Sequence, residues 1–401
     1  MTVALVLSSA TFAINFETDR TWYLAGEPMQ VSVTAEDGMI AYAELCDTYG
    51  LAAGALVSLK DGKGTCIVEL PSELHSGYYV LSVYTSHSGH VAQRLVAVIN
   101  PLHKHEDDDI QWVEITHPDS LSYLSPVRTA DTSAVKTVSM YETEGHIIRA
   151  RVQNVYNGNH FHGNQIRPAI SIIGKQIHYF EGKMVNDSLA VFYTFGIHGR
   201  QPLVLSAETT TGISLPIEII SPFATLLPQQ LPHLVFHYNR SEVEARSIDM
   251  QRHQSDADET IRNGLPSDYD DTLFGNKPEL SYNLDEYRQF FTIREVLLEY
   301  VDCVRSKKIN GATKLLVRRA EDSYISSWPA MVLIDGMPVM DIERLLNYDA
   351  RRIHYINIYG DSYTFGNGIY HGVLSFITRS GRLTNYPVEP NMQYLVYEFP
   401  Q

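Results

Sequence analysis

Short alternations of apolar and polar residues dominate the first hundred positions of the chain. Residues 29–34 alternate without a break, and 41–45 continue the pattern. Turn-forming pairs such as Asp61–Gly62 and Ser76–Gly77 separate such segments at short intervals. A period of two is typical of strands that bury one face, and closely spaced turns favour antiparallel pairing. The pattern predicts an antiparallel β-sandwich over residues 14–101.

A second series of strand-like segments follows a short charged hinge. Apolar segments recur with no helix-length segment between them, at 148–153, 169–173, 189–193, 203–206 and 213–220. An α/β unit would alternate strands with helices, so a second, Ig-like β-sandwich over 106–223 is the better interpretation. The predicted fold class is therefore multidomain and begins with two antiparallel β-sandwiches.

Residues 224–286 have a different composition. Acidic side chains accumulate, apolar ones are sparse, and neither a two-residue nor a helical period is sustained. We therefore predict an acidic linker. The group Asp268–Tyr269–Asp270–Asp271 lacks the other ligands of a calcium-binding EF-hand loop, notably the glycine in its middle, and is interpreted as part of that solvated linker.

Helical periodicity begins at about residue 292. Thr292 and Glu295 form a capping-box pattern, and an apolar stripe follows at helical spacing, made of Val296, Leu297, Tyr300, Val301 and Val304. Lys307 and Lys308 suit a helix C-terminus, where Gly311 can end the helix. These residues predict one amphipathic helix whose stripe faces a core.

Strand and helix patterns alternate beyond this helix. In order, they predict a strand at 314–318, a buried strand that ends in the turn Asp335–Gly336, a short helix capped by Asp341, and two further strands. Helix, strand, strand, helix, strand and strand in this order predict a small α+β domain over 287–401.

Length and charge narrow the classes of function. At ~100–200 residues per domain, 401 residues fit about two to four domains. The net charge of -16 repels nucleic acid and anionic lipid surfaces, so nucleic-acid binding is not expected. Away from the N-terminus, no apolar run is long enough for a helix that spans a bilayer.

Residues 1–13 are interpreted as a truncated signal peptide. The apolar run 3–7 is followed by small residues ending at Ala13, which approximates a signal-peptidase site, although no basic residue precedes Arg20. The alternative interpretation of this segment is a first β-strand. An export signal would place the mature protein outside the cytoplasm.

The three cysteines, Cys46, Cys66 and Cys303, cannot all pair within one chain. Cys46 and Cys66 fall in neighbouring predicted strands, so either a disulfide or two small buried thiols fit their positions. No C-x-x-C pair is present that would favour zinc or redox chemistry.

The familiar local signatures of enzymes and metal sites are missing. The chain contains no G-x-S-x-G, Walker, H-E-x-x-H or kinase motif. His103 and His105 lie in the charged hinge, and His160 and His162 lie in a polar loop, so neither pair is interpreted as a metal site. We therefore nominate no catalytic residue, cofactor or metal, and expect a protein that is not an enzyme.

Aromatic residues on the last predicted hairpin are the candidate interface. The chain has 25 tyrosines, most of which suit packing positions in strands. Tyr355, Tyr359, Tyr363 and Tyr370 are predicted to contact a partner, because aromatic side chains anchor interfaces.

Two segments of the first sandwich resemble a known type of domain. Residues 23–31, read as YLAGEPMQV, and 70–85, which contain the SGYYVLSVYT string, resemble the strands of macroglobulin-like domains of the MG2 type. The Cys-Gly-Glu-Gln thioester of protease-trapping macroglobulins does not occur in this chain. The resemblance therefore implies the fold of such a domain and not its thioester chemistry.

The C-terminal part resembles the plug domain of TonB-dependent outer-membrane receptors. The resemblance rests on the PAMVLIDGMPV string at 329–339, on Tyr359–Gly360 and on the GVLSFIT string at 372–378, and it spans roughly 287–381. Few residues follow Gly381, so the expected domain is a plug-like unit without a barrel. The resemblance implies an outer-membrane protein or a barrel as partner.

These observations predict an exported, non-enzymatic binding or scaffold protein. It would be periplasmic or associated with the outer membrane, and it would contact the uptake machinery through the plug-like domain. Two alternatives stay open, namely an enzyme with an interdomain site and a structural component of a surface assembly. The sequence does not specify the oligomeric state.

Overall fold

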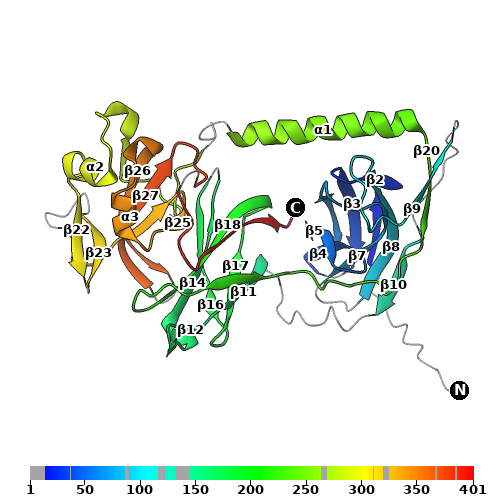
Figure 1. Ribbon diagram of the computed structural model, residues 1–401. Helices are drawn as coiled ribbons and strands as arrows, with labels where there is room; N and C mark the ends of the chain where they lie inside the picture. The colour runs from blue at the N-terminus through cyan, green and yellow to red at the C-terminus, as the bar shows by residue number, and fades with distance from the viewer. Residues whose placement is uncertain are drawn as a thin grey trace, which may run out of the picture.

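The computed structural model describes residues 14–36, 38–85, 90–115, 123, 125–131, 142, 145–174, 176–262, 269–309, 311–318, 325–365, 368–383 and 386–401. Strands make up 52% of the structure and form several sheets, and helices make up 10%. The prediction of a β-rich, multidomain chain is confirmed at this level. The predicted signal segment, 1–13, lies outside the described residues. Figure 1 shows three groups of sheets in a row, which we call the N-terminal, middle and C-terminal modules.

Two sheets form the N-terminal module, an arrangement compatible with a β-sandwich. One has the order β1-β3-β6, with β1 at Ile14–Thr18, β3 at Pro28–Ala35 and β6 at Lys63–Glu69. The other contains β2 (Trp22–Leu24), β4 (Ile40–Cys46), β5 (Leu51–Ser58), β7 (Gly77–Thr85), β8 (His90–Ile99) and β10 (Arg128–Asp131). Both sheets contribute to one core, and the alternation over 29–34 is confirmed because Met29, Val31 and Val33 are buried in it.

The cysteines of this module are free and buried. Cys46 lies on β4, which pairs with β5 and β7, whereas Cys66 lies on β6 in the other sheet. The sequence predicted that the two cysteines lie on neighbouring strands. They lie instead in different sheets, because the chain crosses from one sheet to the other between them. Burial raises the pKa of both thiols to about 12.

The middle module also consists of two sheets around one core. One has the order β16-β17-β11-β19, with β16 at Lys183–Met184, β17 at Leu189–Thr194, β11 at His146–Val152 and β19 at Ile217–Ile220. The other has the order β15-β14-β18-β28, with β15 at His178–Glu181, β14 at Ile166–Ile172, β18 at Gly199–Thr209 and β28 at Gln393–Phe399. A small hairpin joins β12 (Val155–Tyr156) to β13 (Asn159–His160).

Strand β28 belongs to the middle module and not to the C-terminal domain in which the sequence pattern placed it. The sequence pattern predicts a C-terminal domain over 287–401, but β28 pairs along its length with β18 of the middle module. Its Tyr397 and Phe399 side chains fill the core of the middle module. Burial of these rings explains why the chain returns to that module after leaving it.

The segment expected to be an acidic linker contains regular structure. Strand β20 (Leu234–Tyr238) pairs in parallel with β9 (Ile110–Glu114), and helix α1 covers Arg240–Arg262. The Asn239 side chain caps the helix, because its oxygen accepts a hydrogen bond from the backbone N–H of Ser241. Val243 and Met250 are buried, so a narrow apolar stripe directs the first turns onto the N-terminal module, and Figure 1 shows α1 extending towards the C-terminal module.

A five-stranded sheet forms the centre of the C-terminal module. Its order is β21-β26-β27-β24-β25, with β21 at Leu280–Asn283, β26 at Ile353–Phe365, β27 at Gly368–Thr378, β24 at Met331–Ile334 and β25 at Met337–Pro338. Helices α2 (Ile293–Glu299) and α3 (Ile342–Leu346) contribute to its core. A two-stranded hairpin of β22 (Val304–Ile309) and β23 (Ala312–Val317) completes the module.

Helix α2 is shorter than the sequence predicted. The capping box of Thr292 and Glu295 is confirmed, but the helix ends at Glu299 and Val304 begins a strand. Lys307 and Lys308 therefore lie on β22, and Gly311, with φ +82°, lies in the hairpin connection. Pairing of β22 with β23 prevails over the helical spacing of Val301 and Val304.

The turn at Asp335–Gly336 is present between β24 and β25. Asp335 is 1% exposed and has a φ of +46°. Its carboxylate accepts hydrogen bonds from the backbone N–H groups of Thr378 and Leu383, each at 2.7 Å, and from the Thr378 hydroxyl. The turn thereby fastens β24 to the end of β27 and to the chain that follows it.

Candidate functional site

A cleft of about 640 Å³ lies between the middle and C-terminal modules. Strands β14, β15 and β18 line it from the middle module, together with the turn at residues 210–212. The C-terminal module contributes the β22–β23 hairpin, residues 327–332, 338–340 and 342, and Tyr370 of β27. The volume falls within the range of ~300–1,000 Å³ that is typical of small-molecule sites.

Close apolar contacts join the two modules beside this cleft. Ile173 and Val204 of the middle module belong to the same buried cluster as the core of the C-terminal module. Gly336 has a φ of +91°, and a Cβ atom there would lie 2.8 Å from Ile177 Cγ2. Only glycine meets both conditions, so the turn lies directly against Ile177 of the middle module.

Charged groups of both signs converge in the cleft. Arg167 on β14 and Glu208 on β18 form an ion pair, with 3.5 Å between a guanidinium nitrogen and Oε1. Lys314 of β23 and Glu181 of β15 line the same space. Burial raises the pKa of Glu208, and the positive charges of Arg167 and Lys314 oppose that rise. Arg167, Glu181 and Glu208 belong to the middle module and Lys314 to the C-terminal module, so both walls contribute charge to the cleft.

Two tyrosines lie next to these charges. Burial raises the pKa of Tyr370 to about 12, with Arg167 opposing the rise and the carboxylates of Glu208 and Glu181 adding to it. Burial also raises the pKa of Tyr179 well above its usual value. Both phenols are therefore neutral near pH 7 and offer hydroxyl groups rather than charge.

An exposed tryptophan lines the cleft. Trp328 is 63% exposed, and its backbone N–H donates to the Ser326 hydroxyl at 3.1 Å. Its ring stacks on His371 of β27, with centroids 6.0 Å apart and planes 20° apart. A large apolar face held in place by a neighbouring ring is available to a ligand, and its burial on binding would be favourable.

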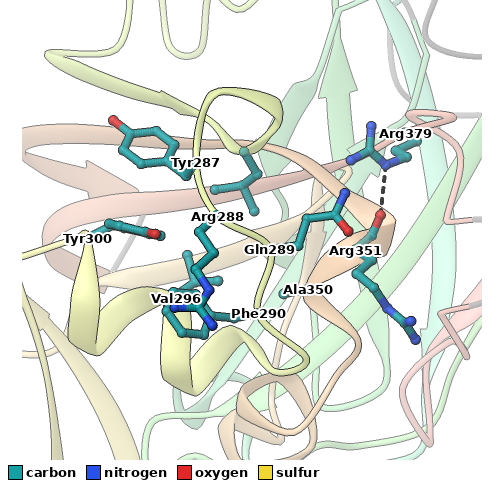
Figure 2. A pocket seen from close by; sticks show the side chains of 10 residues that line it. Tyr287, Arg288, Gln289, Phe290, Val296, Tyr300, Ala350, Arg351 and Arg379 are labelled. Atoms are coloured by element: carbon teal, nitrogen blue, oxygen red, sulfur yellow. Dashed lines mark hydrogen bonds between the residues drawn. The ribbon is translucent and has the colours of Figure 1, made fainter.

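A second pocket, shown in Figure 2, is too small for a ligand. It holds about 10 Å³ and is lined by aromatic rings and arginines around Tyr287, Phe290 and Tyr300. Arg379 Nε donates to the Arg351 carbonyl oxygen at 2.7 Å, which ties the end of β27 to the start of β26. Such a space is about the minimum for one water molecule, so these residues are structural.

The four tyrosines predicted as an interface lie on β26 and β27, where Tyr363 pairs with Tyr370. All four pack in or against one cluster that includes Ile177, Leu273 and Met331. Tyr359 is 3% exposed and its hydroxyl donates to the Asp271 carbonyl oxygen, so that side chain serves the fold. Tyr370 lines the cleft. Contact of Tyr355, Tyr359, Tyr363 and Tyr370 with a partner stays a prediction.

Neither of the two histidine pairs lines this cleft. The rings of His103 and His105 are 6.4 Å apart, and those of His160 and His162 are 5.3 Å apart. The fold brings Asp187 within 3.3 Å of His162 Nδ1, a contact that the sequence did not reveal. Within the described part of the chain, no group of three histidine, cysteine or acidic residues has the geometry of a metal site.

Apart from Tyr370, sequence reasoning did not single out the charged and aromatic residues of the cleft. Arg167, Glu208 and Lys314 come from three strands that are far apart in the sequence, and no local motif connects them. Trp328 directly precedes the strand pattern at 329–339 and could have been noticed as an isolated large aromatic residue in the sequence before that pattern. Only the packing of the two modules shows that these side chains meet.

A scan against protein-family models gives no match for the chain, and a search of curated proteins gives no significant match. Among the residues that the structure describes, none of the helices has the length and apolar character needed to cross a bilayer.

Proposed function

We propose that this protein is an exported, non-enzymatic binding or scaffold protein whose ligand occupies the cleft between the middle and C-terminal modules. The observation that carries the proposal is the cleft itself, with Arg167, Glu208 and Lys314 converging from two modules. Ligand sites in proteins are typically concave, occur between domains and combine apolar surface with a few polar groups. The contact of Gly336 with Ile177 supports preformed walls, which lower the entropic cost of binding.

The proposal extends to a place at the outer membrane. Its support is the resemblance of 287–381 to a plug domain and the export signal read in 1–13. In this account the N-terminal and middle modules act as arms, and the C-terminal module contacts an outer-membrane protein. Recovery of such a protein from cell envelopes with the intact chain is the expected result, and a cytoplasmic location of the native protein would contradict this part.

Ligand-dependent stabilisation tests the cleft directly. We would measure the melting temperature of the full chain with panels of neutral oligosaccharides, tetrapeptides and nucleotides, because a ligand that binds only the folded state raises it. Thr210→Trp fills the cleft from its exposed turn, and Thr34→Trp, on an exposed position of β3, is the matched control.

At least one panel should stabilise the wild type and Thr34→Trp but not Thr210→Trp. If no panel stabilises the wild type, or if Thr210→Trp responds equally, the ligand does not occupy the cleft and the proposal fails.

A hydrolytic enzyme acting in the same cleft is the second candidate. The observation that favours it is the raised pKa of Glu208 close to other ionisable groups, because carboxylic acids with raised pKa values serve as general acids. Mass spectrometry of the same panels after incubation would detect cleavage. Products that form with the wild type and not with Glu208→Gln would establish this candidate, and unchanged panels would remove it.

A further inference from the structure

We infer that the cleft binds a neutral oligosaccharide, with Trp328 as the stacking surface and the pair of Arg167 and Glu208 as the group that recognises hydroxyls. This inference rests on the proposed function and adds the chemical class of the ligand. Four properties of the cleft lead to it, namely its charge balance, its hydrogen-bonding groups, its aromatic surface and the pairing of its strands.

The first property is charge balance. The whole chain carries a net charge of -16, but the cleft is lined by two cations, Arg167 and Lys314, and two carboxylates, Glu181 and Glu208. An anionic ligand would meet Glu181 and Glu208, and a cationic ligand would meet Arg167 and Lys314. A neutral polar ligand avoids both repulsions, because it places no charge against either sign.

The second property is the mixture of donors and acceptors. A sugar hydroxyl donates one hydrogen bond and accepts others, so it suits a site that offers both kinds of group. Arg167 and Lys314 donate, Glu208 accepts, and the hydroxyls of Ser206 and Ser327 do either. The Arg167–Glu208 ion pair is only about one-fifth exposed on each side, so a bound hydroxyl would replace little bulk water there.

The third property is the aromatic surface. The Trp328 ring is largely exposed, and its stacking on His371 limits its freedom before any ligand arrives. The C–H face of a pyranose ring is flat and apolar, and it can cover an indole while its hydroxyls point sideways to polar groups. Tyr179 and Tyr370 add neutral aromatic hydroxyls to the same cleft.

The fourth property separates a saccharide from a peptide. An extended peptide is usually held by the unpaired edge of a strand, where its backbone adds to the sheet. The strands that carry Arg167, Glu208 and Tyr370 are each paired on both sides: β14 with β15 and β18, β18 with β14 and β28, and β27 with β24 and β26. Of the sheet that carries the Arg167–Glu208 pair, only β15, at its edge, has an open side among the cleft-lining strands that the structure describes. Around the Arg167–Glu208 pair, side chains rather than backbone groups are therefore left to recognise the ligand.

Titration calorimetry with the full chain tests this inference. The probes are cellotetraose, maltotetraose and chitotetraose, with tetra-alanine as the peptide comparison. At least one saccharide should bind, and its Kd should change little between low and high salt, because a neutral ligand has no ionic attraction to be screened. A Kd that weakens steeply with salt would contradict a neutral ligand.

Variants then locate the bound saccharide. Trp328→Ala should weaken binding by about tenfold or more, because exposed aromatic anchors carry much of the energy at binding sites. Phe291→Ala is the matched control, since Phe291 is 70% exposed on the same module and does not line the cleft. Glu208→Gln, which keeps the shape but not the charge, should also weaken binding, with a cooperative melting transition as proof of folding.

The outcomes separate this inference from the proposed function. If tetra-alanine binds through Trp328 and no saccharide does, the inference is overturned while a binding cleft stands. If saccharides bind equally to Trp328→Ala and to the wild type, their site lies elsewhere and the inference also fails. If no panel at all stabilises the chain through the cleft, the proposed function fails first.

Discussion

The turn at Asp335 and the cleft each contain a carboxylate whose pKa is raised by burial, but the surroundings of the two carboxylates differ. Asp335 receives hydrogen bonds from Thr378 and Leu383 and is closed off from solvent. Glu208 faces Arg167 at 3.5 Å in a space large enough for a small molecule. A carboxylate saturated by its own chain serves the fold, whereas one left facing an open cleft can serve a ligand.

The largest expected effect is on the Asp335 side of this comparison. Asp335→Ala removes the acceptor for two backbone N–H groups and one hydroxyl, all buried, which should cost roughly 3–5 kcal/mol of unfolding free energy. Chemical denaturation of the full chain measures the loss. The exposed Asp361 on β26 gives the control, Asp361→Ala, which should stay within ~0.5 kcal/mol of wild type. Equal losses in both variants would contradict the role of Asp335.

The contact between the modules should show the next largest effect. Gly336→Ala adds a Cβ atom 2.8 Å from Ile177 Cγ2 at a left-handed backbone position, and should cost about 1–3 kcal/mol. Gly158→Ala is the matched control, because Gly158 has a similar φ of +77° and open space around it. The difference between the two melting temperatures isolates the module contact. If Gly158→Ala is as costly as Gly336→Ala, backbone strain alone explains the loss.

The smallest expected effect is the pH dependence caused by Glu208. Burial raises its folded-state pKa, so the folded protein holds this proton more tightly than the unfolded chain does. That contribution is complete below the ordinary glutamate pKa and is lost as pH rises through the folded pKa. Stability should therefore fall slightly over this interval in the wild type and less in Glu208→Gln. Identical pH profiles of melting temperature in the two proteins would show that burial of Glu208 does not change its pKa enough to affect stability.

Local signals in the sequence predicted local structure. The alternation over 29–34, the capping box of Thr292 and Glu295, and the Asp335–Gly336 turn are all decided by neighbouring residues, and the structure contains each of them. Helix α1 was missed because its apolar stripe is narrow, while the cap at Asn239 and its helix-favouring composition were the available signs.

Features set by distant partners were not predictable from one sequence. Strand β28 pairs with β18, about two hundred positions earlier, and the pattern of β28 does not say which edge it will join. The end of α2 was misplaced for the same reason, since β22 owes its extended form to pairing with β23. The cleft forms only when β14, β18 and β23 come together from distant parts of the chain. No local sequence pattern therefore marks Arg167, Glu208 and Lys314 as residues of one site.

Hydrogen exchange of the full chain, with and without the best-binding tetrasaccharide, tests the central claim most directly. We expect slower exchange in residues 206–212 of the middle module and 327–332 of the C-terminal module, the two walls of the cleft, and unchanged exchange in the N-terminal module. Protection that appears on one wall only, or on a surface away from both walls, would contradict a ligand held between the modules.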